Sequence, residues 1–202
     1  MYKSILIHHK MNTNFIIRLL IYCNAIFMLL GISVKAQNTG ILHDTDDGRK
    51  YKTIKIGNQW WMAENLNYYT PDGSWCYNED SVNCAKYGRL YTWETAKKVC
   101  PRGWHVPSKE EFQILIDELE NGINNPYEQL ILNGTSGFDA LLSGCFTESN
   151  NYYDKEVNGY YWTSSKDYLD HIWYLNLYSE NNNAFFYFKK EMKALSVRCL
   201  KN

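Results

Sequence analysis

The feature that most constrains the fold of this chain is a pair of cysteine-bearing signatures that lie far apart in the sequence. The first is YGRLYTWETAKKVCPRGWHVPS, residues 87–108, and the second is SVRCL, residues 196–200. Cys100 stands at the end of a predicted helix and Cys199 in the last predicted strand. A disulfide between them would close nearly the whole domain into one covalent loop. Such a pair indicates an architecture rather than an active site, and it identifies neither a ligand nor a reaction.

Residues 1–36 have the features of an export signal. The apolar run from Leu19 to Val34 follows a positive flank and is shorter than the roughly 20 residues that a membrane-spanning helix needs. It ends in Val34-Lys35-Ala36, a small-residue cleavage pattern, so we expect cleavage after Ala36. An uncleaved anchor is the alternative. Cleavage would place the protein in the periplasm, at the cell surface or outside the cell, with no membrane span remaining.

The remainder of the chain, beyond the signal, is long enough for one domain. Residues 37–43 are expected to be a short flexible lead-in and residues 44–202 a single domain, since about 165 residues bury most of their apolar surface in one core. The formal net charge is -1 and lysine and arginine do not cluster. Nucleic-acid recognition depends on neutralising phosphates, so we expect no nucleic-acid partner.

Aromatic residues are unusually frequent. They make up 16% of the chain, with 17 tyrosines and 7 tryptophans, and many lie among Asn, Ser and Asp. Tyrosine and tryptophan can bury a ring while a polar tip stays in water, so this composition suits an exposed binding surface. A β-rich core packed with aromatic side chains would account for most of them as well.

The cysteines beyond the export signal predict disulfides, because an oxidising compartment preserves them. Cys76 and Cys84 flank the turn-rich segment YNEDSVN, and their pairing would be a short local staple. Zinc binding is the rival interpretation, but the spacing lacks a second ligand pair, so we expect no metal. Cys145, within LLSGCF, is expected to be a buried and inert thiol, with intermolecular pairing or reactivity as alternatives.

The beginning of the domain has the pattern of a hairpin. Residues 51–56 and 59–62 are strand-like and flank Gly57-Asn58, a two-residue turn candidate. The preceding cluster Asp44-x-Asp46-Asp47-Gly48 is similar to the start of a calcium loop. It lacks the later glutamate at the required spacing, so we expect a turn.

Two helices and a series of strands come next. Residues 92–100 predict a short helix with Trp93 and Ala96 on its buried face, and Ser108 with Glu111 forms a capping box that opens a second helix ending at Asn121-Gly122. From Gly137 on the pattern changes to short strands. Helices followed by consecutive strands indicate an α+β domain. The expected strands are residues 138–142, 160–164, 172–177, 184–188 and 196–199.

Four separated motifs together resemble one known family. They are DGRKYKTIKIGNQWWMAENLNY, YGRLYTWETAKKVCPRGWHVPS, YYWTSS and SVRCL, in that order. Over residues 44–201 the chain resembles the Fibrobacter succinogenes major paralogous domain family, secreted modules abundant in Bacteroidetes and Fibrobacteres. That family in turn looks like the C-type lectin-like superfamily. The resemblance implies a Cys100–Cys199 disulfide and two helices packed on a twisted antiparallel sheet with long irregular loops.

The resemblance does not bring a sugar site with it. The chain lacks the Glu-Pro-Asn, Gln-Pro-Asp and Trp-Asn-Asp tripeptides of calcium-dependent lectins. We therefore expect a calcium-independent, non-catalytic recognition module without a cofactor, whose ligand is a glycan or a protein at the cell surface. Residues 150–188 are dense in Tyr, Trp, Asn, Asp and Ser, as binding loops are. The expected ligand-binding residues are Tyr168, Asp170, His171, Trp173, Asn181, Asn182 and Asn183.

Two other classes of function stay open. A structural or adhesive subunit of a surface appendage would use the same kind of domain. An enzyme would need an activated nucleophile, and Cys145 would then require a nearby base. His105 is expected to make a structural hydrogen bond and His171 to lie in a loop, so the sequence favours no catalytic residue.

Overall fold

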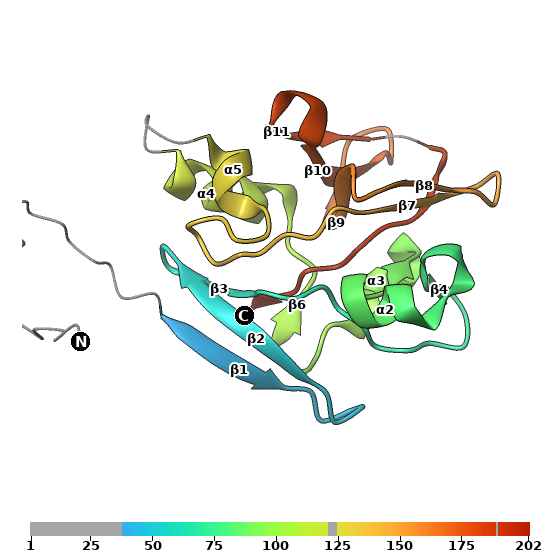
Figure 1. The fold of residues 1–202 in the computed structure, drawn as a ribbon, viewed down its shortest axis with the longest axis horizontal. Helices are drawn as coiled ribbons and strands as arrows, with labels where there is room; N and C mark the ends of the chain where they lie inside the picture. The colour runs from blue at the N-terminus through green and yellow to red at the C-terminus, as the bar shows by residue number, and fades with distance from the viewer. Residues whose placement is uncertain (1–37, 121–124, 189) are drawn as a thin grey trace, which may run out of the picture. The chain divides into compact units, whose positions relative to one another are not determined.

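Two sheets form the framework of the part of the chain that the computed structural model describes, residues 38–120, 125–188 and 190–202 (Figure 1). The predicted export signal lies outside these residues. The first sheet is five-stranded and antiparallel. Its order is β1 (Thr39–His43), β2 (Lys50–Ile56), β3 (Gln59–Met62), β13 (Leu200–Lys201) and β6 (Trp104–His105).

The second sheet is six-stranded and holds most of the late strands. Its pairs are antiparallel except for a parallel contact between β7 and β9. A two-stranded sheet joins β4 (Ser74–Trp75) to β5 (Leu90–Tyr91). The six-stranded sheet runs in the order β11 (Asn183–Tyr187), β10 (Ile172–Tyr178), β9 (Asn158–Lys166), β7 (Ser143–Thr147) and β12 (Met192–Ala194), with β8 (Tyr152–Lys155) also paired to β7.

The helices are short. None in the described residues is long and apolar enough to cross a bilayer. Helix and sheet together confirm the α+β class, with sheet predominating. The helices are α2 (Ser81–Tyr87), α3 (Trp93–Val99), α4 (Lys109–Leu119) and α5 (Pro126–Leu130), and the 3-10 turns are η1 (Tyr77–Glu79) and η2 (Ser179–Asn181).

Local signals in the sequence place the first hairpin and the two main helices. Gly57 has φ +55 in the turn between β2 and β3, a conformation that glycine adopts without strain. The Thr92 side chain caps α3 by accepting a hydrogen bond from the Thr95 backbone. At α4 both hydrogen bonds of the Ser108–Glu111 capping box are present. These elements confirm their predictions, although α4 ends at Leu119, before the predicted stop, which lies outside the described residues.

The expected lead-in contains a strand. Thr39–His43 is β1 and pairs with β2 from Thr39↔Ile54 to His43↔Lys50. Leu42 packs against the core, and this contact stabilises β1 in the sheet together with its hydrogen bonds to β2. The prediction of a flexible segment is therefore wrong for residues 39–43.

The core lies on both faces of β9 and β10. On one face Tyr161, Leu175 and Leu177 pack with α4 and α5, and on the other Trp162 and Tyr174 pack with α3. Figure 1 shows α4 and α5 grouped beside these strands. The strand predicted for residues 172–177 is thus confirmed as β10, and both of its faces are covered.

Two predicted strands are displaced along the chain. Residues 138–142 form no strand, because Asp139 has φ 51 and the carbonyls of Phe138 and Asp139 accept hydrogen bonds from Arg198. The strand starts later, as β7. Residues 196–199 also lie outside a strand, between the two sheets. Their backbone bonds to both sides: Ser196 N to Tyr160 O at 3.1 Å, Leu66 N to Val197 O at 2.9 Å and Met62 N to Cys199 O at 3.0 Å.

Both expected disulfides are present. Cys76–Cys84 encloses η1 and the start of α2, where the sequence predicted only a polar loop. The Asp80 side chain caps α2 by accepting a hydrogen bond from Val82 N. Cys100–Cys199 joins the end of α3 to the segment between the sheets. Cys145 takes part in neither disulfide and is 2% exposed, as expected of a buried thiol.

Candidate tyrosine cleft

The residues expected to bind a ligand fall into two groups at opposite ends of β10. Tyr168, Asp170 and His171 lie in the turn between β9 and β10, followed by Trp173 on β10. Asn181 and Asn182 lie in the turn between β10 and β11, and Asn183 begins β11. The seven residues of β10 separate the two turns by about 20 Å. One small ligand would therefore meet only one group, and their role in binding stays a prediction.

Internal contacts define the β9–β10 turn. Asp167 Oδ1 accepts hydrogen bonds from the backbone of Leu169 and His171, and Asp167 Oδ2 lies 2.8 Å from His171 Nδ1. The His171 ring stacks on Phe188 with centroids 4.4 Å apart. Tyr168, at 93% exposed, projects away from this arrangement. Asp167 thus holds the turn together, and the turn presents Tyr168, Leu169 and Asp170 to solvent.

Trp173 belongs to a second small cluster. Its ring meets Phe188 edge-on, with centroids 5.1 Å apart, and Lys109 Nζ lies 3.9 Å from its centroid. Lys109 also faces Phe186 at 5.6 Å. Because Lys109 covers one face of these rings, less ring surface is left for a ligand.

A cleft that the sequence analysis missed opens on β7, β8 and β9, the hairpin region drawn in orange in Figure 1. Its volume is about 420 Å³. Cys145 on β7 and Tyr153 on β8 are directly opposite each other in the ladder, so their side chains share one face. We call this site the tyrosine cleft; it is lined by Cys145, Thr147, Ser149, Tyr153, Asp154, Tyr160, Glu191 and Met192.

Hydrogen bonds hold the side chains of the cleft in place. Tyr160 donates its hydroxyl hydrogen bond to Asp154 Oδ2 and accepts one from Asn158 Nδ2 at 3.3 Å. Burial, reinforced by the Asp154 carboxylate, raises the pKa of Tyr160 far above its usual value. The Tyr160 phenol therefore stays protonated at neutral pH and donates to Asp154 Oδ2, which leaves Asp154 Oδ1 for further donors.

Aromatic rings continue from the cleft across the sheet. Tyr160 meets Tyr174 edge-on at 5.9 Å, and Tyr174 meets Tyr187 at 6.2 Å. Burial raises the pKa of Tyr174 too, whereas Tyr187, on the outer strand β11, is half exposed. The lining residues include two carboxylates, Asp154 and Glu191, and no lysine, arginine or histidine. The cleft thus offers hydrogen-bond acceptors beside ring surfaces.

The other polar residues singled out in the sequence have structural partners. His105 lies with Nδ1 2.7 Å from Asn202 Oδ1 and with Nε2 3.0 Å from both carboxylate oxygens of Glu111, as a structural role predicts. The Asp44 carboxylate accepts from Asp46 N at 3.0 Å within a turn closed by Gly48. Across residues 38–120, 125–188 and 190–202, no group of three or more His, Cys, Asp or Glu side chains is placed to hold a metal ion.

Comparison with known proteins gives one match. The family model described as the Fibrobacter succinogenes major domain matches residues 54–201, most of the chain. No curated protein and no solved structure matches the chain.

Proposed function

The chain belongs to the Fibrobacter succinogenes major domain family, and we propose that it is an exported, non-catalytic recognition module that binds a glycan in the tyrosine cleft. The cleft is the observation that carries this proposal. Sugar rings place C–H faces against aromatic side chains and donate hydroxyl hydrogen bonds to acceptors such as carboxylates. Tyr153 and Tyr160 supply the rings and Asp154 and Glu191 the acceptors.

We propose further that the scaffold is C-type lectin-like. The Cys100–Cys199 disulfide joins the end of α3 to the segment that precedes β13. Strands from both ends of the domain, β1 and β13, belong to the same sheet, and helices pack on the late strands. We expect binding to be independent of calcium, because the chain lacks the tripeptides of calcium-dependent lectins and its described residues hold no group of three or more His, Cys, Asp or Glu side chains placed to hold a metal ion.

A glycan array tests this function. The purified, oxidised protein is screened with calcium and with a chelator, and a bound glycan is then titrated against variants. Tyr153→Ala is expected to weaken binding about tenfold, the contribution of one stacked ring, and Glu191→Gln to weaken it similarly by removing a charged acceptor. Calcium is expected to change neither result.

The matched control is Tyr69→Ala, which removes an exposed tyrosine that lies outside both the cleft and the β9–β10 turn. It should leave the affinity unchanged. Loss of binding in Tyr168→Ala with full binding in Tyr153→Ala would move the site to that turn. Binding to no glycan would refute the glycan ligand and favour a protein partner, as for an adhesive or appendage subunit.

A further inference from the structure

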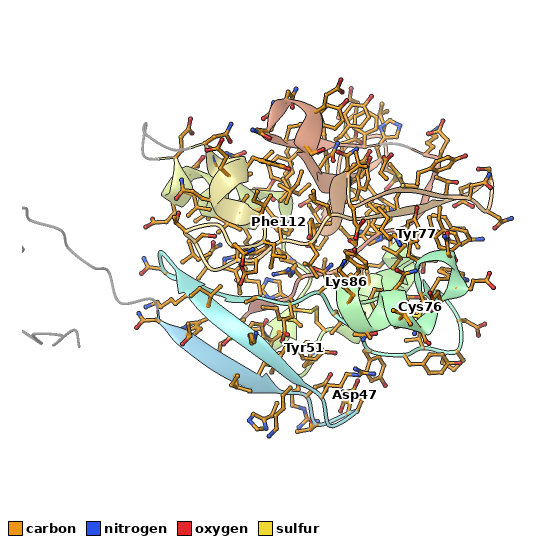
Figure 2. All side chains as sticks on the ribbon, viewed as in Figure 1. Asp47, Tyr51, Cys76, Tyr77, Lys86 and Phe112 are labelled. Atoms are coloured by element: carbon orange, nitrogen blue, oxygen red, sulfur yellow. A yellow bond between two sulfur atoms is a disulfide. The ribbon has the colours of Figure 1, made fainter. Side chains whose placement is uncertain are left out.

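Away from the tyrosine cleft, three adjoining cavities follow β2. Their volumes are about 520, 420 and 270 Å³. The first and second share Lys52, Ala63 and Asp139 as lining residues, and the second and third share Lys86, Leu132 and Leu141. The three cavities are therefore one continuous groove, which we call the β2 groove. Figure 2 labels Tyr51 on β2 and Lys86 on α2, two residues that line it.

The middle of the groove is rich in cations, with Arg49, Lys50, Lys52 and Lys86 on its walls. Two carboxylates lie among them, and each accepts one backbone hydrogen bond: Glu64 Oε2 from Lys52 N at 2.7 Å and Asp139 Oδ1 from Asn133 N at 3.0 Å. Two of the cations are neutralised from outside the middle section, Arg49 by Asp47 and Lys86 by Glu156.

Lys50 and Lys52 make no ion pair within the described residues. Both are exposed, and they alternate with Tyr51, which is buried, so they lie on the same face of β2. Two residues along a strand place their Cα atoms about 7 Å apart. The groove thus presents a pair of ammonium groups whose spacing equals that of alternate side chains on an extended chain.

The two ends of the groove are aliphatic. At one end Ile41 is 57% exposed, and at the other Leu132 is 52% exposed beside Ile131 and Leu142. Open aliphatic walls bury aliphatic side chains. One aromatic residue, Tyr87, also lines the Leu132 end, where its hydroxyl donates a hydrogen bond to Glu156.

We propose that the β2 groove binds an extended peptide segment of a partner protein, with acidic residues at alternate positions in its centre and aliphatic residues on both sides. Carboxylates at positions i and i+2 of the peptide meet Lys50 and Lys52, and the flanking side chains enter the aliphatic ends. This interaction is independent of the glycan site, so either one can fail in experiment without the other.

Fluorescence anisotropy tests the proposal with the labelled peptide Leu-Thr-Glu-Thr-Glu-Thr-Leu. The wild-type protein is expected to bind it, more weakly at higher salt, and to bind the peptide with both glutamates replaced by lysine at least tenfold less well. The double variant K50E/K52E is expected to reverse this preference. Leu132→Ser is expected to weaken binding while keeping the salt dependence, since it removes apolar contact only.

The control is K98E/K201E, which reverses two exposed charges elsewhere and should bind as the wild type does. Thermal unfolding of each variant verifies that the fold is intact; if K50E/K52E unfolds, K50M/K52M replaces it and should lose the discrimination between the peptides. Equal affinity for both peptides, no binding, or unchanged preference in K50E/K52E would overturn the proposal. Oligogalacturonate and unlabelled peptide are also compared as competitors. If oligogalacturonate displaces the labelled peptide at a lower concentration than the unlabelled peptide does, the groove is assigned to an acidic polysaccharide instead.

Discussion

At the scale of single residues, Arg198 has the most consequential environment. Its side chain is completely buried and donates hydrogen bonds to Asn65 Oδ1 at 2.6 Å and to the carbonyl oxygens of Met62, Phe138 and Asp139. Burial lowers the pKa of Arg198, yet a guanidinium stays charged in proteins. The residue therefore ties two separate stretches of the chain, residues 62–65 and 138–139, to its own segment.

Removing this guanidinium should be strongly destabilising. Arg198→Leu leaves buried acceptors without donors, each of which costs about 1–3 kcal/mol, so the free energy of unfolding should fall by roughly 3 kcal/mol or more. Urea denaturation measures the difference, with the exposed Arg102→Leu as the control. A loss equal to that of the control would show that the Arg198 contacts do not stabilise the fold.

At the scale of elements, the segment around α2 combines a short disulfide with a cation. Arg89 Nη1 lies 3.3 Å from Cys84 Sγ and 3.5 Å from Cys76 Sγ, and Arg89 Nε donates to Ser74 Oγ at 3.0 Å. A neighbouring positive charge stabilises thiolates once a disulfide is reduced. The small core of this segment thus depends on the Cys76–Cys84 disulfide, which the neighbouring Arg89 makes easier to reduce.

The two disulfides should consequently differ in their ease of reduction. On titration with dithiothreitol, Cys76–Cys84 should open first, because Cys199 in the other disulfide is completely buried. Arg89→Gln should require more dithiothreitol to open Cys76–Cys84, while Arg102→Gln should not change it. Alkylation followed by peptide mass spectrometry identifies the reduced pair at each step. The same titration midpoint in wild type and Arg89→Gln would contradict the role assigned to Arg89.

At the scale of the whole molecule, the segment from Ser196 to Cys199 connects the parts of the domain. Its backbone bonds to β9 on one side and to residues 62–66 on the other, and Cys199 ties it to the end of α3. These bonds join the two sheets and a helix through four consecutive residues. A disulfide at this point limits the freedom of most of the unfolded chain.

The effect of each disulfide on stability should follow the length of the loop it closes. Cys100–Cys199 spans 99 residues, for which loop-closure entropy predicts about 4–5 kcal/mol, whereas Cys76–Cys84 spans 8 and should contribute about 2–3 kcal/mol. C100A/C199A should therefore lower Tm by on the order of 10 °C, more than C76A/C84A does. Calorimetry of both double variants makes the comparison, and equal losses would rule out loop closure as the main cause.

The tyrosine cleft shows why the binding surface was harder to predict than the helices. Cys145, Asp154, Tyr160 and Glu191 come from separate elements, and no spacing in the sequence links them. The predicted residues, by contrast, were chosen from a single stretch by composition, and β10 places them at two distant turns. The one signal in the sequence for this cleft would have been an exposed tyrosine, Tyr153, on a predicted β8, and that strand was not predicted.

The first hairpin, α3, α4 and the α+β class could be predicted from the sequence, because turn glycines, capping residues and apolar periodicity act between neighbours in the chain. Its separated motifs also identified the family that the comparison confirmed. Tertiary structure alone decided that residues 39–43 form a strand, that residues 138–142 and 196–199 do not, and where the cavities open. The backbone of those segments bonds to distant partners such as Arg198, Leu66 and Tyr160, and such bonds form only when the sheets come together.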